Sequence, residues 1–200
     1  MSLSDLMILL FVFFVVLFSF AYKKMGTADF QRIAAVLRDE PREKTPLDEV
    51  HERLEKWSAE RNLKEAVTIE KKDDAITLNI KDQVLFQSGD YRLRPESAEL
   101  VAVLGEALTK VPAPYRLGIE GHTDDAPFRG ESREFHDNWD LSTRRAHAVL
   151  IALKLGGDPL QRSVVMGYGE MRPIAPNHDS HGVALPSNQA RNRRVTIRVF

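Results

Sequence analysis

The sequence predicts an α+β protein with a single N-terminal transmembrane helix, a helical linker, and a domain whose helices pack on one face of a mixed β-sheet. Three observations favour this class. An uncharged apolar run comes first, amphipathic helical patterns follow it, and in the second half strand patterns alternate with helical ones. We expect the transmembrane helix at residues 1–22, the linker at 23–62 and the domain at 63–200.

The composition excludes several classes of function. The chain has 28 basic and 29 acidic residues, so its net charge does not favour a nucleic-acid partner. It contains no cysteine, which excludes thiol catalysis, disulfides and cysteine-ligated metals. The sequence shows no nucleophile–base pair and no phosphate-binding glycine loop. We therefore expect a protein that is not an enzyme and that holds no cofactor.

The uncharged run extends from Leu6 to Ala21 and is long enough to be a membrane helix. A cleaved signal peptide is the alternative, because Ser19-Phe-Ala21 resembles a cleavage site. However, the residues before the run include Asp5 and no Lys or Arg, whereas a signal peptide begins with positive charge. We expect an uncleaved helix that ends at the interfacial residues Tyr22-Lys23-Lys24.

Asp5 lies at the edge of this run, where it could be a helix N-cap or an acid at the membrane interface. The run spans about 24 Å as a helix, less than the ~30 Å hydrocarbon core, so Asp5 would be drawn inward. On a helical wheel, modest side chains share the face of Asp5 and aromatic side chains lie opposite. The first set is Leu9, Val12, Val16 and Ser19, and the second is Phe11, Phe14 and Phe18. An acid within a membrane is usually functional, so we predict that Asp5 binds and releases a cation.

The linker contains two helical patterns. The first has apolar residues at helical spacing, namely Phe30, Ile33, Ala34 and Leu37. The second begins at Thr45 as N-cap, with Pro46 at the first helical position and Asp48 at the capping-box position. Its apolar face consists of Val50, Leu54 and Trp57. This segment is either a tether with a first helix of the domain or a plug-like segment that covers part of a membrane partner.

Within the domain, period-two patterns predict strands and period-3.6 patterns predict helices. We expect strands at 66–70, 75–80, 115–120, 163–166 and 195–200 and helices at 95–110 and 142–155. The first two strands form a predicted hairpin across Lys71-Lys-Asp-Asp74.

Four short motifs occur in the order and spacing of the OmpA-like peptidoglycan-binding domain. They are Gly121-His-Thr-Asp124, Leu141-Ser-x-x-Arg145-Ala146, Gly167-Tyr-Gly-Glu170 and Asn192-Arg-Arg-Val195. The chain resembles this family from about Gln83 to Phe200. Asn138-Trp-Asp-Leu-Ser142 narrows the resemblance to the flagellar stator subunits MotB and PomB, and Asp5 followed by Phe13-Phe14 agrees with it independently.

The resemblance implies a ligand, the diamino acid of the peptidoglycan stem peptide, usually diaminopimelate, whose side-chain end is zwitterionic. Asp124 would bind its ammonium and Arg145 its carboxylate, the latter through a forked pair. Further contacts are implied for Thr123, Asn138, Leu141 and Arg194. Arg194 would either add positive potential or hold the last strand. Without the resemblance, Asp124 and Arg145 would be interpreted as a surface ion pair.

The resemblance also implies a stator subunit of an ion-driven motor that carries H⁺ or Na⁺ on Asp5. Such a subunit would form a homodimer inside a MotA-like multi-span partner. It would be a single-pass protein of the inner membrane, with a cytoplasmic N-terminus and a periplasmic domain. A structural tether between inner membrane and cell wall, which needs no acid at position 5, is the alternative.

Three histidines are weaker candidates. We expect His122 to support its turn. His178 and His181 lack an evident third ligand, so a solvated loop is favoured over a metal site.

Overall fold

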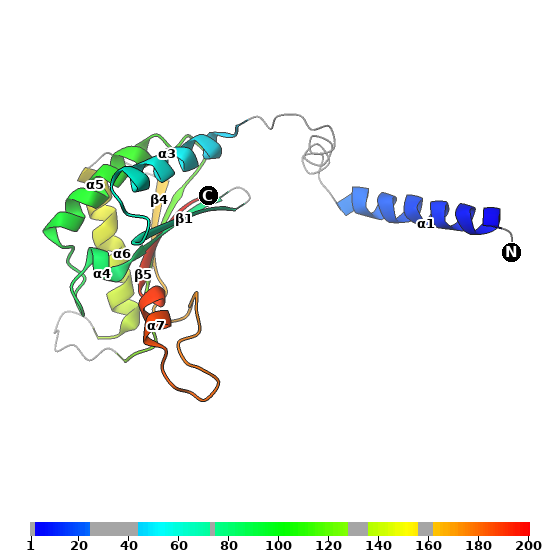
Figure 1. Cartoon of the computed structure of the whole chain (residues 1–200). Coiled ribbons are helices and arrows are strands. Elements are labelled where there is room, and N and C mark those ends of the chain that lie inside the picture. The colour runs from blue at the N-terminus through cyan, green and yellow to red at the C-terminus, as the bar shows by residue number, and fades with distance from the viewer. Residues whose placement is uncertain (1–2, 25–43, 73–74, 128–135, 156–161) are drawn as a thin grey trace. The chain divides into compact units, whose positions relative to one another are not determined.

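A computed structural model describes residues 3–24, 44–72, 75–127, 136–155 and 162–200. The chain divides into two compact units, Met1–Glu43 and Lys44–Phe200 (Figure 1). The first predicted helical pattern of the linker, which contains Phe30 and Leu37, lies outside the described residues.

The described part of the first unit is the helix α1 (Leu3–Lys24). Its side chains from Ser4 to Phe20 are exposed, although most of them are apolar. Among the helices that the described ranges contain, none combines the length and the hydropathy required to cross a membrane. The transmembrane helix therefore stays a prediction.

The second unit contains one mixed sheet, as predicted. Its strands are β1 (Val67–Lys72), β2 (Ala75–Lys81), β3 (Leu117–His122), β4 (Ser163–Gly167) and β5 (Arg194–Val199). They lie in the order β1-β2-β5-β3-β4, and β3 and β4 are parallel while the other neighbours are antiparallel. A parallel pair needs a long crossover, and the helix α6 (Asn138–Leu155) lies in this connection.

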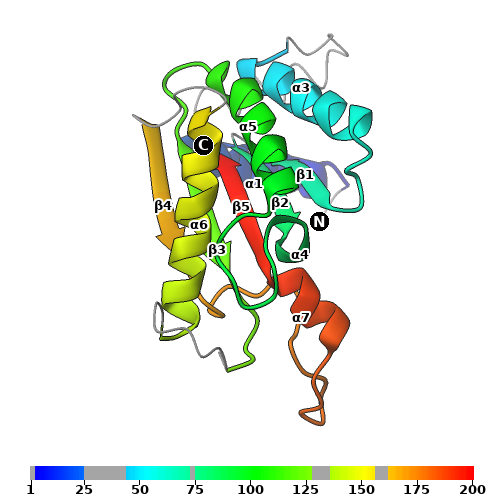
Figure 2. The same cartoon turned by 90° about the vertical axis from the view of Figure 1, so that its left-hand side faces the viewer.

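Helices cover one face of the sheet (Figure 2). They are α3 (Pro46–Glu60), α5 (Pro95–Thr109) and α6. Between them and the sheet lies the apolar core, with fully buried side chains such as Leu54, Leu104, Ile119, Leu153 and Ile197. The predicted helices on one face of a mixed sheet are confirmed. Two short helices, α4 (Asp82–Leu85) and α7 (Pro186–Asn192), were not predicted.

The helix α3 belongs to the domain and not to a linker. Its predicted capping box is confirmed, because the Asp48 N–H donates to Thr45 Oγ1 at 3.2 Å and the Thr45 N–H donates to Asp48 Oδ2 at 2.7 Å. Its apolar face packs into the same core through Leu47, Val50, Leu54 and Trp57. The compact unit therefore begins at Lys44, earlier than the boundary at residue 63 that the sequence suggested.

The start of α6 lies directly against the end of β3. A Cβ atom on Gly121 would stand 1.9 Å from the backbone oxygen of Ser142. Only glycine allows this approach, because a backbone atom cannot move aside as a flexible side chain can. The contact places the residues that follow β3 next to the first turns of α6.

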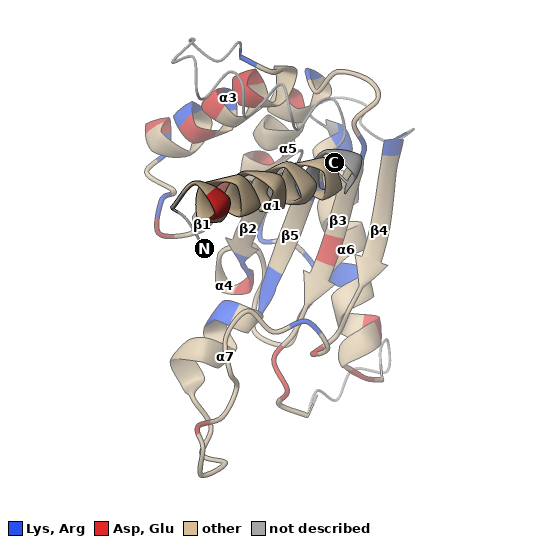
Figure 3. Ribbon diagram, turned by 90° about the vertical axis from the view of Figure 1, so that its right-hand side faces the viewer, with Lys and Arg blue, Asp and Glu red and all other residues tan. Residues whose placement is uncertain are grey.

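The opposite face of the sheet carries charged side chains, which Figure 3 colours, and uncharged polar ones such as Thr196 and Asn79. Successive side chains of a strand point to opposite faces of the sheet, so the residues that alternate with the core residues lie on this face. Thr196 donates its hydroxyl to Asn79 Oδ1 at 2.7 Å, and Glu120 lies 3.4 Å from the guanidinium of Arg198. A sheet whose strands are mostly antiparallel commonly packs one face on the core and leaves the other face polar.

Candidate ligand-binding site

A cavity of about 590 Å³ lies where β3 ends and α6 begins. Four segments that are distant in sequence meet there: α4 with the loop after it, the loop after β3, the first turns of α6, and Arg193 between α7 and β5. It is lined by Asp82, Gln83, Phe86, Ser88, Gly89, Arg94, Thr123, Asp124, Ala126, Pro127, Asn138, Leu141, Arg145 and Arg193. Among the described residues, the charged ones in the lining are three arginines and two aspartates.

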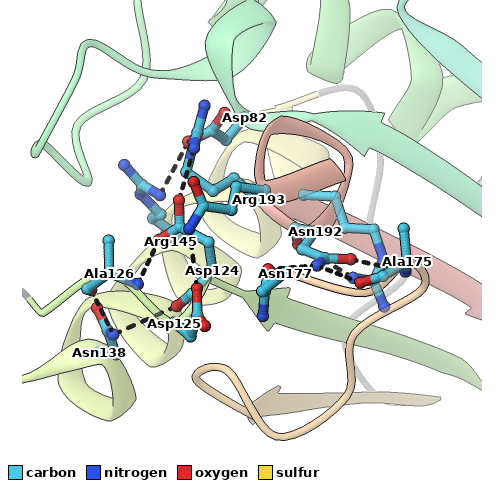
Figure 4. Close-up of polar contacts among 12 residues, drawn as sticks. Asp82, Asp124, Asp125, Ala126, Asn138, Arg145, Ala175, Asn177, Asn192 and Arg193 are labelled. Atoms are coloured by element: carbon cyan, nitrogen blue, oxygen red, sulfur yellow. Dashed lines mark hydrogen bonds and ion pairs between the residues drawn. The ribbon is translucent and has the colours of Figure 1, made fainter. Parts of the chain in front are cut away.

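Charges of alternating sign form a connected chain in this cavity (Figure 4). Arg193 Nη1 contacts Asp124 Oδ2 at 2.6 Å, and Arg193 Nε lies 3.5 Å from Asp82 Oδ2. The same Asp82 oxygen accepts a hydrogen bond of 3.2 Å from Arg145 Nη1. Each aspartate is therefore bound to an arginine, and Asp82 lies between two of them.

The carboxyl–guanidinium pair at the base of the cavity is desolvated. Burial raises the pKa of the Asp82 carboxyl above its usual value, although the charges of Arg145 and Arg193 act to lower it. Burial also lowers the pKa of the Arg145 guanidinium, against the opposing effect of Asp82. A charged group in such surroundings interacts more strongly with a ligand of opposite charge than it would in water.

Arg145 is held in one orientation by three contacts. Besides its bond to Asp82, its Nε donates to the Asp90 carbonyl at 2.9 Å, and its guanidinium lies 5.0 Å from the centre of the Phe86 ring. Its side chain is only 4% exposed. A fixed guanidinium loses little conformational freedom when it binds a carboxylate.

Hydrogen bonds of backbone and side-chain groups position the loop after β3. The Thr123 N–H donates to the Gly169 carbonyl at 2.9 Å, and the Ala126 N–H donates to Asp124 Oδ1 at 3.3 Å. Asn138 Nδ2 donates to the Ala126 carbonyl and to Glu170 Oε2, both at 3.0 Å. Asn138 thus connects the start of α6 with the loop that carries Asp124.

Thr123 has a buried hydroxyl that makes no hydrogen bond with any residue in the described ranges. The residue is only 4% exposed and lines the cavity. An unpaired buried hydroxyl is costly, so a ligand atom that bonds to it would be favoured.

Five of the six residues that the resemblance implied for ligand binding lie around one cavity: Thr123, Asp124, Asn138, Leu141 and Arg145. The structure does not contain the surface ion pair between Asp124 and Arg145 that the sequence would suggest without the family resemblance. Asp124 is paired with Arg193, and Arg145 is paired with Asp82.

Arg194 does not line the cavity. Its guanidinium donates to the carbonyls of Asn192 and Arg172, and burial lowers its pKa to about 10. The structure therefore corresponds to the second of its two predicted roles, holding the last strand. Its neighbour Arg193 occupies the cavity in its place.

The sequence interpretation missed Asp82, Arg94 and Arg193. Arg193 stands within the Asn192-Arg-Arg-Val195 motif, so the motif itself was the available signal. Asp82 begins a helix of four residues, which is too short to show a periodic pattern.

The remaining candidates lie outside the cavity. His122 is buried, stacks on Tyr168 with ring centres 5.4 Å apart, and has its pKa lowered by burial against the effect of Glu120. His178 Nδ1 lies 3.0 Å from Asp125 Oδ2, and no cluster of three metal-ligand residues occurs in the described part of the chain. Asp5 lies in the first turn of α1, in the other compact unit.

Comparisons with known proteins agree with this geometry. The model of the OmpA family matches residues 85–193, a range that contains most of the cavity. The chain is 30% identical to Motility protein B of Bacillus subtilis (strain 168) over 156 residues, which are 77% of this chain and 56% of that protein. The chain thus spans little more than half the length of this relative.

Many solved structures are similar to the chain, among them the following two. A putative MotB-like protein from Desulfovibrio vulgaris is 26% identical, with a TM-score of 0.65 over 76% of this chain and 91% of that one. The cell wall anchor of the T6SS from Pseudomonas aeruginosa is 28% identical, with a TM-score of 0.63 over 75% of this chain and 98% of that one.

Proposed function

The chain belongs to the OmpA family and is MotB-like, and we propose that its unit Lys44–Phe200 anchors it to peptidoglycan by binding the zwitterionic end of the stem-peptide diamino acid. The observation that carries the proposal is the cavity in which Asp124 and Arg145 lie together, each at a fixed position and with its own counter-ion.

The chemistry of the cavity suits a ligand end with one ammonium and one carboxylate. The ammonium binds the Asp124 carboxylate and the carboxylate binds the Arg145 guanidinium, both through charge-assisted hydrogen bonds. The Thr123 hydroxyl, which has no partner among the described residues, provides a further donor and acceptor. Leu141 forms an apolar wall for the methylene chain between the ligand's charged groups.

The similar proteins support an anchoring role. One solved structure of the same fold is described as a cell wall anchor, and its identity of 28% extends over three quarters of this chain.

The test is a sedimentation assay with purified, insoluble peptidoglycan and the full chain in detergent. Asp124→Ala removes the proposed ammonium partner and should abolish co-sedimentation. Glu99→Ala is the matched control, because it removes an exposed carboxylate on α5 that is not part of the cavity. Undiminished binding of Asp124→Ala would contradict the proposal.

We further propose that α1 lies in the inner membrane and that Asp5 carries H⁺ or Na⁺ for a MotA-like multi-span partner, with two copies of this chain in the complex. The proposed topology is a single-pass helix with a cytoplasmic N-terminus and a periplasmic domain. Support comes from the exposed apolar surface of α1 and from the similarity to Motility protein B over 77% of the chain.

The alternative is a tether without a motor, and the similarity to the T6SS cell wall anchor supports it. Asp5→Asn distinguishes the two. In a motor it stops H⁺ or Na⁺ uptake into vesicles that contain the chain and its multi-span partner, while assembly and peptidoglycan binding persist. Full ion uptake by Asp5→Asn would exclude the ion-carrying role, and absence of uptake by the wild type would favour the tether.

A further inference from the structure

Arg193 occupies the position where the proposed ligand must bind. Its Nη1 lies 2.6 Å from Asp124 Oδ2, the carboxylate oxygen expected to receive the ligand ammonium. A ligand ammonium can reach this oxygen fully only if Arg193 gives up part of this contact. In the absence of ligand, Arg193 therefore serves as the counter-ion of Asp124.

Arg193 is fixed from its other side by Asp82. The guanidinium Nε lies 3.5 Å from Asp82 Oδ2, and the Asp82 N–H donates to the Arg193 carbonyl at 3.1 Å. Asp82 also holds Arg145, so it cannot fully compensate a second arginine. When Arg193 loses Asp124, it needs another anion.

The charge of the cavity makes this requirement stronger. Among the described residues, three arginines and two aspartates line it, so the formal charge of these residues is already positive. A ligand end that brings only an ammonium raises this positive charge and leaves Arg193 without a full partner. A ligand end that also brings a carboxylate restores a partner to Arg193, and the number of ion pairs rises.

We propose that Arg193 makes the cavity selective for a zwitterionic ligand end over an end that carries an ammonium alone. The ligand ammonium replaces Arg193 at Asp124, and the ligand carboxylate binds the released Arg193 together with Arg145. This inference rests on the proposed function, and it assigns to Arg193 the discrimination between diaminopimelate and lysine at the same place in a stem peptide. Those two side chains differ by one carboxylate.

The test uses two probes, diaminopimelate blocked at its backbone amine and carboxyl so that its side-chain end is free, and lysine blocked in the same way. Their affinities for the full chain in detergent are measured by titration calorimetry. The wild type should prefer the diaminopimelate probe. Arg193→Gln should bind the lysine probe roughly tenfold more tightly than the wild type does, because Asp124 is then free, while its affinity for the diaminopimelate probe falls or is unchanged.

Two further variants complete the test. Arg191→Gln removes a neighbouring exposed arginine from α7 and should leave both affinities within about twofold, which excludes a general effect of net charge. Arg193→Lys keeps the charge and should show a smaller gain for the lysine probe than Arg193→Gln. Thermal unfolding of each variant verifies that it folds.

The outcomes separate this inference from the function on which it rests. If the wild type bound neither probe, the proposed function would fail, and this inference with it. If the wild type preferred diaminopimelate but Arg193→Gln gained no affinity for the lysine probe, or if Arg193→Lys gained as much, only the role of Arg193 would be overturned.

Discussion

Asp82 and Arg145 form an ion pair of 3.2 Å at the base of the cavity although 63 residues separate them in the chain. Their side chains are 11% and 4% exposed. The pair connects the short helix α4 with α6 and fixes the guanidinium that the proposed ligand carboxylate would bind. Asp82, which belongs to none of the four motifs, therefore orients Arg145, which belongs to one of them.

Removing the negative charge of Asp82 should destabilise the domain. Asp82→Asn leaves Arg145 buried without its carboxylate partner, and we expect the free energy of unfolding to fall by about 3 kcal/mol. Urea denaturation measures this through the tryptophan fluorescence, to which the buried Trp57 and the half-exposed Trp139 both contribute. Asp140→Asn removes the partner of Arg144 in a half-exposed pair and should cost less than about 0.5 kcal/mol. Equal effects of the two variants would show that burial of the Asp82 pair contributes nothing.

The contact between α3 and the sheet should make stability depend on pH in the acid range. Asp48 contacts Lys71 of β1 and accepts from Thr45, and these contacts hold the pKa of its carboxyl well below the usual range. A carboxyl whose pKa is lower in the folded state stabilises it fully above the unfolded pKa of about 3.9, and this contribution is lost as the pH falls further.

Asp48→Asn should therefore flatten the dependence of the urea midpoint on pH between about pH 5 and pH 2. Glu49→Gln is the control, since Glu49 is exposed on the same first turn of α3, and this variant should retain the wild-type slope. An Asp48→Asn profile parallel to that of the wild type would mean that the contact with Lys71 does not stabilise the fold.

The sequence predicted the mixed sheet and the helices on one face because these elements are long and periodic. It also predicted that Thr123, Asp124, Asn138, Leu141 and Arg145 would lie together, because short motifs mark them. The motifs did not predict which of the neighbours Arg193 and Arg194 lines the cavity. α7 ends at Asn192 and β5 begins at Arg194, so Arg193 lies at a junction whose direction no periodic pattern determines.

The close packing of α6 on β3 leaves no room for a side chain at position 121. In Gly121→Ala the new Cβ would stand 1.9 Å from the Ser142 carbonyl oxygen, so the helix and the strand must separate. We expect a loss of at least about 3 kcal/mol in unfolding free energy and weaker peptidoglycan binding, because the loop with Asp124 follows this strand. Urea denaturation and co-sedimentation measure the two effects.

Gly118→Ala is the matched control on the same strand. Its Cβ would stand 3.2 Å from Met166 Cε and from Phe200 Cε1, the outer parts of two side chains that can move by a few tenths of an ångström, and 3.9 Å from Arg198 Cβ, an ordinary contact distance. We expect a cost below about 1 kcal/mol. If both alanine variants were equally stable, the close contact between β3 and α6 would not be a constraint on the fold.

The unpaired hydroxyl of Thr123 should affect binding more than stability. Thr123→Val keeps the shape of the side chain and removes a buried hydroxyl that has no partner among the described residues, so the free energy of unfolding should stay equal or rise by up to about 1 kcal/mol. If this hydroxyl bonds to the ligand, affinity for the blocked diaminopimelate probe should fall by roughly tenfold. Thr196→Val is the contrast, because the Thr196 hydroxyl donates to Asn79 Oδ1 at 2.7 Å on the far face of the sheet. That variant should lose about 1 kcal/mol of stability and keep its affinity. A Thr123→Val chain that loses stability but binds as the wild type does would assign this hydroxyl to the fold and not to the ligand.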